Sequence, residues 1–383
     1  MWRALLFMSA LVVLGGLGAL FWTPCLDHEA IAEIDTAVTA EVMRITEGDL
    51  ARADGYIYTV DVAQLMIVLA RRGDEVAFRG LADQVLPYLW RDDPSDPYTR
   101  GFVPWRFKQG EPPDASGTTE ALRLADALWL GSERFEHPQW RRQAVVILEG
   151  YCRHAFEEQG IWLIRNYFNF QTRAFANDSF LVDYHPDLLA RAAQASDGAL
   201  RLSAQESRAD IDTRRRRFAE VAEQTYTVVR RAQASTGLFR SMVQPDVATL
   251  LPERDLAFFA PDGIVQLNNS CAVAESVVEG DPQVARKLLD FAVGRLLGLK
   301  RYYDVNTGAY RGEKRAGVAT WTCLVRLAAR LDDEEAARRL ARHTLWHWET
   351  TVEYGIHAPR LYTAGEVLLA IEWLQSRWPS TRH

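Results

Sequence analysis

The connections between helices are the feature of this 383-residue sequence that most restricts its fold. After residue 28, apolar residues recur at helical spacing, and the alternation typical of strands is nowhere sustained. Short acidic or prolyl connections, such as 72–74 and 331–333, alternate with long aromatic ones, such as 91–116 and 236–264. If successive helices run up and down, every long connection lies at the same end of the bundle. Long loops are usually functional, so this end is expected to be the working face.

The periodicity predicts helices of two kinds. They are expected at residues 29–47, 59–72, 75–90, 117–131, 138–157, 178–195, 205–234, 265–279, 282–298, 316–331, 333–349 and 361–377. Helices that follow long connections, such as 62–70 and 271–278, are apolar nearly all round, whereas those that follow tight turns, such as 333–348, are amphipathic. An inner ring of buried helices within an outer ring of amphipathic ones describes an (α/α)6 toroid. Residues 26–383 are therefore predicted to form one all-α toroid of helical hairpins.

The N-terminal segment has the length and composition of a membrane anchor. Residues 4–22 are almost purely apolar, and a helix needs roughly 20 such residues to cross a bilayer. Arg3 precedes this stretch and acids follow it, so the positive-inside rule leaves the N-terminus in the cytoplasm. A cleaved signal peptide is the alternative, but residues 21–25 lack the small-residue pattern of a cleavage site. We therefore expect residues 1–25 to anchor the chain in a bacterial inner membrane, with the main domain periplasmic or extracytoplasmic.

Charge and cysteine content exclude several classes of function. The chain carries 44 Lys and Arg against 51 Asp and Glu, so it lacks the basic character of a nucleic-acid binder. None of the 4 cysteines forms a CxxC pair, and we expect no metal and no cofactor. Cys271 and Cys323 fall near the starts of neighbouring inner helices, where either a disulfide or two buried thiols would fit.

Carboxylates gather at the predicted starts of the inner helices, which converge beneath the long loops of a toroid. Helix capping explains Asp114 well, because acids and their amides are preferred at the first turn. Capping explains Asp61 and Glu120 less well, so these two residues and Asp178 are the predicted catalytic groups. The predicted substrate-binding residues lie on the same helix starts and on the aromatic loops. They are Asp114, Trp105, Tyr167, Asn177, Asp262, Asn268, Tyr303 and Tyr362.

Paired carboxylates beneath aromatic side chains suit the hydrolysis of a glycan. In inverting glycosidases one protonated carboxyl group serves the leaving oxygen and one ionised carboxylate activates water, about 6.5–9.5 Å away. Crowding and burial move the pKa values of such groups apart, which assigns the two roles. Aromatic rings such as Trp105 pack on the apolar faces of sugars, and arginines such as Arg106 could meet acidic substituents.

The stretch from Asp114 to Trp129, DASGTTEALRLADALW, resembles the signature of the family 8 glycoside hydrolases. In that signature Ala-Ser-Asp-Gly-Asp opens a helix that continues as Ile-Ala-x-Ala-Leu. Together with the alternation of short and long connections after residue 28, this stretch makes the chain resemble the six-hairpin glycosidase superfamily, and most nearly family 8. That family includes periplasmic endoglucanases attached to bacterial cellulose export. This chain has Gly117 and Thr119 where the signature has its two aspartates, so Asp114 and Glu120 are the nearest acids.

The resemblance also concerns the start of the first inner helix. The general acid of the family is a glutamate in a Ser-Glu-Gly pattern that opens this helix. Here the helix opens Tyr58-Thr59-Val60-Asp61, with an acid that is shorter by one methylene.

Three functions are compatible with these patterns. The first is a hydrolase of an exported or cell-envelope polysaccharide. The second is a lyase or epimerase acting on uronate polymers, which would use Tyr58, Tyr184, His185 or Asn268 instead of a carboxylate pair. The third is an inactive glycan-binding subunit of an envelope polysaccharide synthesis or export system. Carboxylates that face a shared cavity would favour hydrolysis, whereas a convergence of Tyr, His and Arg would favour elimination.

Overall fold

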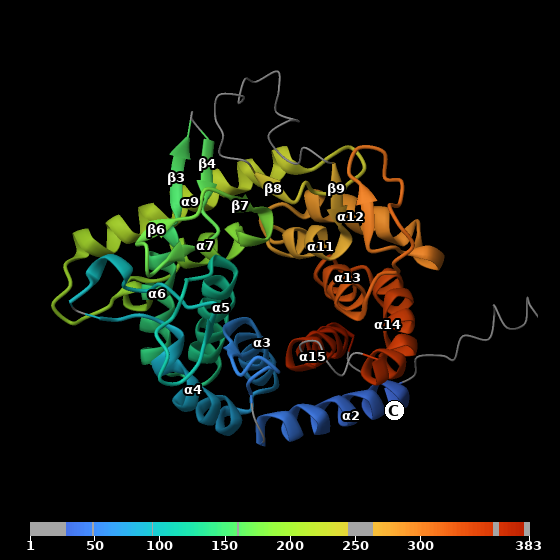
Figure 1. Cartoon of the computed structure of the whole chain (residues 1–383), viewed down its shortest axis with the longest axis horizontal. Helices are drawn as coiled ribbons and strands as arrows, with labels where there is room; N and C mark the ends of the chain where they lie inside the picture. Colours follow the sequence, from blue (N-terminus) through green and yellow to red (C-terminus); the bar gives the residue numbers. More distant parts are fainter. Residues whose placement is uncertain are drawn as a thin grey trace, which may run out of the picture.

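The computed structural model describes residues 28–47, 50–93, 95–158, 161–243, 263–354 and 360–378. Within these ranges the long helices form two concentric rings around a common axis (Figure 1). The inner ring consists of α3 (Thr59–Arg72), α5 (Thr118–Arg134), α7 (Pro186–Ala193), α11 (Leu267–Glu275), α13 (Val318–Arg330) and α15 (Arg360–Arg377). The outer ring consists of α2 (His28–Glu47), α4 (Glu75–Leu89), α6 (Pro138–Cys152), α9 (Arg208–Ala232), α12 (Pro282–Val293) and α14 (Glu334–Tyr354). The predicted all-α toroid is confirmed.

The tight joints are built from the residues that the sequence singled out. Gly73 ends α3 in the left-handed conformation, with φ 74°, which glycine adopts without strain. Asp74 then caps α4, because its side chain accepts a hydrogen bond from the N–H of Ala77 at 3.0 Å. Asp281 and Asp333 begin α12 and α14 in the same way. These short joints lie opposite the long connections.

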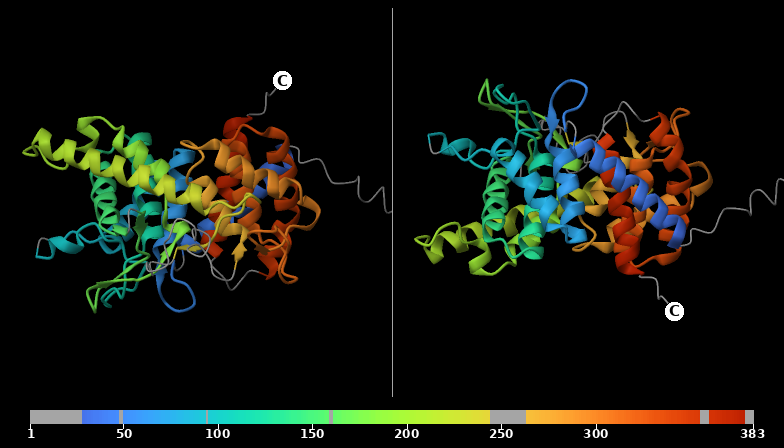
Figure 2. Two further views of the ribbon diagram at one scale, coloured as in Figure 1. Left: turned by 90° about the horizontal axis from the view of Figure 1, so that it is seen from above. Right: turned by 90° about the horizontal axis from the view of Figure 1, so that it is seen from below.

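The long connections project from one face of the ring, as the two side views show (Figure 2). Short antiparallel ribbons tie them together, so the loops contain strands that the sequence pattern did not indicate. The pairs are β1 (Ile57–Tyr58) with β2 (Arg106–Phe107), β3 (Ala155–Glu158) with β4 (Ile161–Ile164), β5 (Phe168–Asn169) with β6 (Ala174–Phe175), β7 (Ser179–Phe180) with β8 (Met242–Val243), and β9 (Ile264–Gln266) with β10 (Tyr302–Asp304). The short helical turns are η1 (Pro97–Thr99), η2 (Leu181–Asp183), α8 (Asp197–Leu200) and η5 (Leu296–Gly298).

The third inner helix differs most from its prediction. A helix was expected over 178–195, but α7 begins only at Pro186. Proline is favoured at the first helical position and disfavours helical backbone in the residue before it, so the helix starts there. The preceding residues form β7 and the turn η2 instead. The prediction that Asp178 opens an inner helix is therefore wrong.

The inner helices are not apolar all round, because their axial faces carry buried charge. Arg326 of α13 donates hydrogen bonds to Glu275 of α11 at 2.9 and 2.8 Å and to Glu366 of α15 at 2.8 Å. Glu366 also accepts from Gln64 of α3, whose amide oxygen accepts from Arg123 of α5 at 2.6 Å. We call these five side chains the floor network. Burial alone would raise the pKa of Glu275, but Arg326 outweighs it and holds this pKa at about 2.

The ring closes where α3 meets both α2 and α15. Arg72, at the end of α3, donates to Glu372 of α15 at 2.6 Å and to Thr39 of α2 at 2.8 Å, and it pairs with Asp35 of α2. The last inner helix therefore lies between α13 and α3 (Figure 1).

The described ranges contain no helix that is both long and apolar enough to cross a membrane. The predicted anchor at residues 4–22 lies outside these ranges.

Candidate functional site

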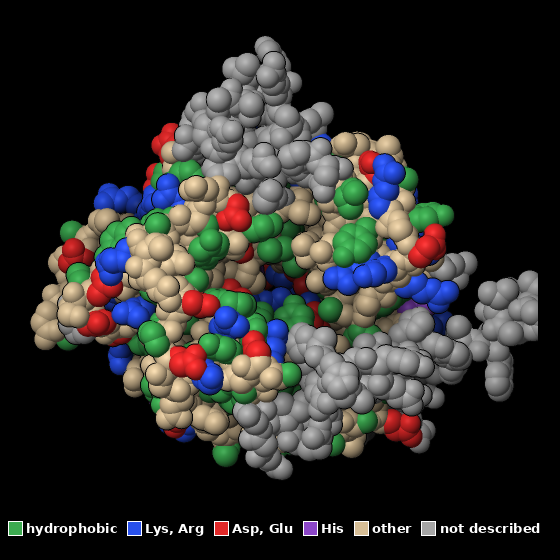
Figure 3. All heavy atoms as spheres, in the orientation of Figure 1, with side chains coloured by type: hydrophobic (Ala, Val, Ile, Leu, Met, Phe, Trp, Pro, Cys, Tyr) green, Lys and Arg blue, Asp and Glu red, His purple; other side chains and the backbone are tan. Residues whose placement is uncertain are grey.

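The face that bears the long loops is hollowed at the centre of the ring, and acidic and basic side chains are visible inside the hollow (Figure 3). Two of the predicted catalytic carboxylates lie in the first turns of α3 and α5. The other groups of the candidate site reach it from the connections between the helices.

Glu120 lies in the first turn of α5, where the chain is fixed by backbone contacts. The N–H of Gly117 donates to the carbonyl of Val103 at 2.8 Å, and the N–H and hydroxyl of Thr118 both donate to the carbonyl of Asn166. Burial raises the pKa of Glu120 to about 7; the positive charge of Arg52 opposes this rise, and the negative charge of Asp61 adds to it. Glu120 is thus poised to hold or release a proton near neutrality.

Gly117 leaves the space that the Glu120 carboxyl group fills. A Cβ atom at position 117 would lie 1.9 Å from Oε2 of Glu120 and 3.1 Å from the Cβ of Trp105. The family signature has an aspartate at position 117. In this chain, the carboxyl group of Glu120 therefore fills part of the space that an aspartate side chain at position 117 would occupy. Position 117 precedes Glu120 by about one helical turn.

Gly117→Ala is expected to push the Glu120 carboxyl group out of its buried position, because the new methyl would overlap Oε2. The pKa of Glu120 should then fall from about 7 toward its ordinary value of 4.5. A carboxyl-carbon NMR titration measures this shift, with the Glu120 signal assigned by its loss in Glu120→Gln. Gly80→Ala on α4 is the control, because a methyl there meets nothing within 4 Å. An unchanged Glu120 titration in Gly117→Ala would show that this contact does not hold the carboxyl group.

Asp61 is held by an arginine from the loop before α3. Its side chain is 2% exposed, and Arg52 donates to its two oxygens at 2.8 and 2.7 Å. Burial raises the pKa of Asp61, and the hydrogen bonds and positive charge of Arg52 oppose this rise. The bidentate pair with Arg52 favours the ionised form of Asp61, whereas burial favours the protonated form and sets the net direction of the shift.

Arg52 also connects Asp61 to an aromatic wall. Its guanidinium lies 3.6 Å from the ring centroid of Tyr58, and Tyr58 packs edge-to-face on Trp105 with 5.4 Å between centroids. The indole N–H of Trp105 donates to Asp114 at 2.7 Å. Two predicted substrate-binding residues, Trp105 and Asp114, are therefore in direct contact beside the predicted catalytic pair.

Asp178 reaches this neighbourhood from the loop before β7. The N–H of Asn166 donates to the backbone carbonyl of Asp178 at 3.0 Å, and Asn166 in turn holds Thr118 at the start of α5. The Oδ1 atom of Asp178 is buried and has no hydrogen-bond partner. Buried polar atoms are almost always paired, so this oxygen is placed to bind a water molecule or a substrate hydroxyl group.

Asp183 is a site carboxyl group that the sequence did not single out. It ends η2, is 2% exposed, and accepts a hydrogen bond from Thr119 at 2.6 Å. Burial raises the pKa of Asp183 to about 7, the charge of Glu120 acts in the same direction, and hydrogen bonds from Thr119 and Thr118 oppose the rise. Pro186 was the signal that could have found it, because a helix that starts there leaves Asp183 in a loop next to α5.

The other predicted substrate-binding residues are scattered over the same face. Asn177 and Tyr167 are exposed, the latter at 38%, and Asn268 is half-buried in the first turn of α11. Burial raises the pKa of Tyr362, which lies close to Glu366 and Arg123 of the floor network. Asp262 lies outside the described residues.

Tyr303 does not offer a face for stacking on a sugar. It is 2% exposed, packs edge-to-face on Phe291, and accepts the backbone N–H of Lys300 at 2.7 Å. Several loop aromatics serve the same packing purpose. Phe102 and Phe168, for example, are almost completely buried in one cluster of rings. The number of aromatic residues in the loops therefore overstates how many aromatic rings are exposed to a ligand.

Cys271 and Cys323 are free, buried thiols. The thiol of Cys323 donates to Glu275 at 3.0 Å, beneath the candidate site. Of the two possibilities left open by the sequence, the structure has the pair of buried thiols.

No family model matches this chain, and no curated protein matches it. Solved structures do resemble it. An alpha-amylase from Clostridium perfringens superposes with a TM-score of 0.65 at 14% identity, over 87% of this chain and 96% of that one. A family 8 glycoside hydrolase from Teredinibacter turnerae, in a xylobiose complex, gives 0.55 at 13% identity, over 85% and 83%.

A third solved structure, an endo-beta-1,4-glucanase from Acetobacter xylinum, gives a TM-score of 0.51 at 16% identity, over 77% of this chain and 91% of that one. These likenesses show that the chain has the six-hairpin fold of family 8-like glycosidases. The resemblance stated from the sequence is confirmed at the level of the fold.

Proposed function

We propose that this protein is a glycoside hydrolase that cleaves a polysaccharide by a carboxylate-pair mechanism with inversion. The observation that supports this most strongly is Glu120, a carboxyl group with a pKa of about 7 beside the ion-paired Asp61. Glycoside hydrolysis with inversion requires one protonated carboxyl group as general acid, which Glu120 can supply, and a second carboxylate as general base.

Glu120 is the proposed general acid. Because its pKa lies near neutrality, it can carry a proton at working pH and donate it to the leaving glycosidic oxygen. Trp105, whose Cβ lies close to the Glu120 carboxyl group, is the proposed platform for a sugar ring.

Asp178 is the proposed general base. A base needs a free lone pair for the attacking water, and Oδ1 of Asp178 has no partner. Both oxygens of Asp61, in contrast, already accept hydrogen bonds from Arg52. The proposed role of Asp61 is to neutralise Arg52, whose positive charge would otherwise lower the pKa of Glu120 further.

The elimination mechanism has less support, because two of its candidate residues are occupied elsewhere. Tyr184 is 1% exposed, and its hydroxyl bonds to Ser179 and to the N–H of Ile164. The imidazole of His185 accepts the N–H of Leu188 as the cap of α7. Tyr184 is therefore not available to a substrate, and Nδ1 of His185 is already engaged.

The proposed substrate is an exported or cell-envelope polysaccharide, and the proposed location is the outer side of an inner membrane, anchored through residues 4–22. The apolar length of that segment supports this part of the proposal. An envelope polysaccharide synthesis or export complex is the corresponding proposed partner.

Incubation of the full-length protein, purified in mild detergent, with a panel of neutral and uronate polysaccharides tests the function. We expect new reducing ends from at least one polymer, with the inverted anomer as the first product by proton NMR. Products with unsaturated ends would instead establish elimination. Binding of a polymer without any cleavage would establish the inactive glycan-binding subunit.

A further inference from the structure

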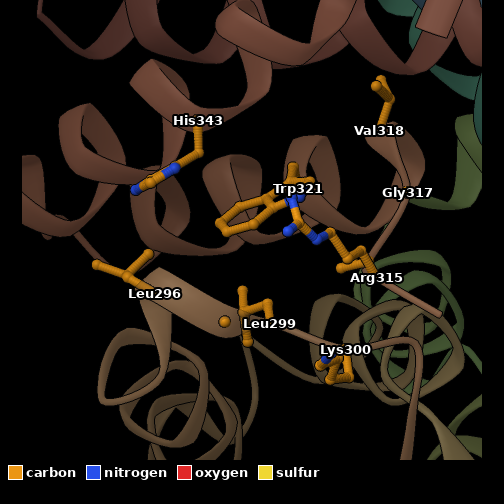
Figure 4. A pocket seen from close by; sticks show the side chains of 10 residues that line it. Leu296, Leu299, Lys300, Arg315, Gly317, Val318, Trp321 and His343 are labelled. Atoms are coloured by element: carbon orange, nitrogen blue, oxygen red, sulfur yellow. The ribbon is translucent and has the colours of Figure 1, made fainter. Parts of the chain in front are cut away.

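A second cavity lies on the loop-bearing face, away from the carboxylates. Its volume is about 370 Å3, and it is enclosed by the start of α13, by α14 and by the two segments 296–300 and 315–317 (Figure 4). The described residues that line it are Leu296, Gly298, Leu299, Lys300, Arg315, Ala316, Gly317, Val318, Trp321 and His343. A volume of this size accommodates one small ligand.

One side of the cavity is apolar. Leu296, Leu299 and Val318 contribute aliphatic surface, and Trp321 stacks on His343 with ring centroids 5.0 Å apart and an angle of 19° between the planes. This wall is suited to the body of a compact ring rather than to a bare inorganic ion.

The other side is positively charged. Lys300 and Arg315 face each other across an antiparallel bridge, and like charges in directly opposed positions repel. Among the described residues, the acid that pairs with Lys300 is Glu313, 3.4 Å away, which is 91% exposed and so screens this charge weakly. None of the described lining residues is acidic.

The start of α13 adds to the positive potential. Gly317 is the N-cap of this helix and provides no side-chain acceptor for its first N–H groups. Helix N-termini favour negative charge, and this one opens into a cavity that already contains two cationic side chains. Arg315 extends toward Trp321 in Figure 4, so a charged group and an apolar ring of one ligand could be bound together.

We propose that this cavity binds a sugar unit that bears a carboxylate, with the carboxylate between Lys300 and Arg315 and the ring against Leu299 and Trp321. It would hold an acidic residue of a glycan outside the cleft of Glu120. The proposal does not depend on cleavage at Glu120, since none of the lining residues belongs to that site.

Isothermal titration calorimetry of the full-length protein with sodium glucuronate tests the proposal. Glucose is the uncharged control ligand, and inorganic phosphate is the control for an anion without a sugar ring. Glucuronate should bind, glucose should bind at least tenfold more weakly, and phosphate should not displace glucuronate at equal concentration. The double variant Lys300→Gln, Arg315→Gln should lose about tenfold or more in affinity, because two charge-assisted hydrogen bonds are removed.

Two controls isolate the cavity. Arg311→Gln removes a cation whose partner is Asp304 and which does not line the cavity, so binding should be unchanged. Glu120→Gln should also leave binding unchanged, which separates this proposal from the hydrolase proposal. Equal binding of glucuronate by the wild type and the double variant, or equal binding of glucose and glucuronate, would overturn the proposal. Displacement of glucuronate by equimolar phosphate would reduce the cavity to a general anion site and overturn the sugar assignment.

Discussion

Glu120→Gln is expected to lower polysaccharide turnover by about a hundredfold to ten-thousandfold, the usual contribution of a general acid. The amide preserves the shape of the side chain but cannot donate the proton. In the wild type, kcat/KM should fall about tenfold per pH unit above pH 7, because raising the pH through a pKa of about 7 removes the proton that the leaving oxygen needs. This alkaline decline should be absent from the residual activity of Glu120→Gln. Initial rates across the pH range measure both effects.

Glu111→Gln is the matched control for this substitution. Glu111 is an exposed acid on the same face, bound to Lys108 and Tyr56, so its replacement should leave turnover nearly unchanged. Asp178→Asn should lower turnover as strongly as Glu120→Gln, and Asp61→Asn should lower it and also shift the alkaline decline to lower pH, because a negative charge beside Glu120 is lost. Full activity in Glu120→Gln would dismiss the carboxylate mechanism.

Arg326→Met is expected to cost about 3–5 kcal/mol in the free energy of unfolding, as measured for buried pairs that lose one partner. The Arg326 side chain is 4% exposed and neutralises both Glu275 and Glu366. Without it, Glu275 loses its ion-pair partner, and among the described residues Glu366 retains only the guanidinium of Arg123, 4.0 Å away. Denaturant unfolding followed by circular dichroism measures the loss.

Two further variants show whether the loss comes from charge or from packing. Arg311→Gln breaks an ion pair whose arginine is 55% exposed, and it should cost less than about 1 kcal/mol. Adding Glu275→Gln to Arg326→Met removes one uncompensated charge and should recover part of the stability. If the double variant is no more stable than Arg326→Met, the cost arises from lost packing rather than from the carboxylates.

The fold was predictable because the residues that end one helix and begin the next act through local interactions. Gly73 and Asp74 end one helix and begin the next through their own backbone and side-chain preferences, so the limits of α3 at 59–72 agree between sequence and structure. The segment 178–195 was mispredicted because its apolar spacing suits a helix, whereas the pairing of Ser179 and Phe180 with residues 242–243 is a long-range contact that no local pattern reveals.

The positions of the candidate site residues were predictable only where these residues coincide with helix starts. Asp61 and Glu120 could be placed because they stand in the first turns of inner helices. Arg52 could not, since nothing in a loop sequence indicates which carboxylate its guanidinium will reach. The floor network could not be predicted for a different reason. Glu275 and Arg326 are 51 residues apart, and each lies in a largely apolar helix, where an isolated charge resembles an exception to the pattern.

The way the ring closes sets when this protein can finish folding. Gln64 and Arg72 of α3 find their partners Glu366 and Glu372 in α15, 302 and 300 residues later in the chain. Contacts of such sequence separation form only after nearly the whole toroid has been synthesised, and they are slow to form. Until α15 arrives, the early hairpins form an open arc with α3 lacking its neighbour.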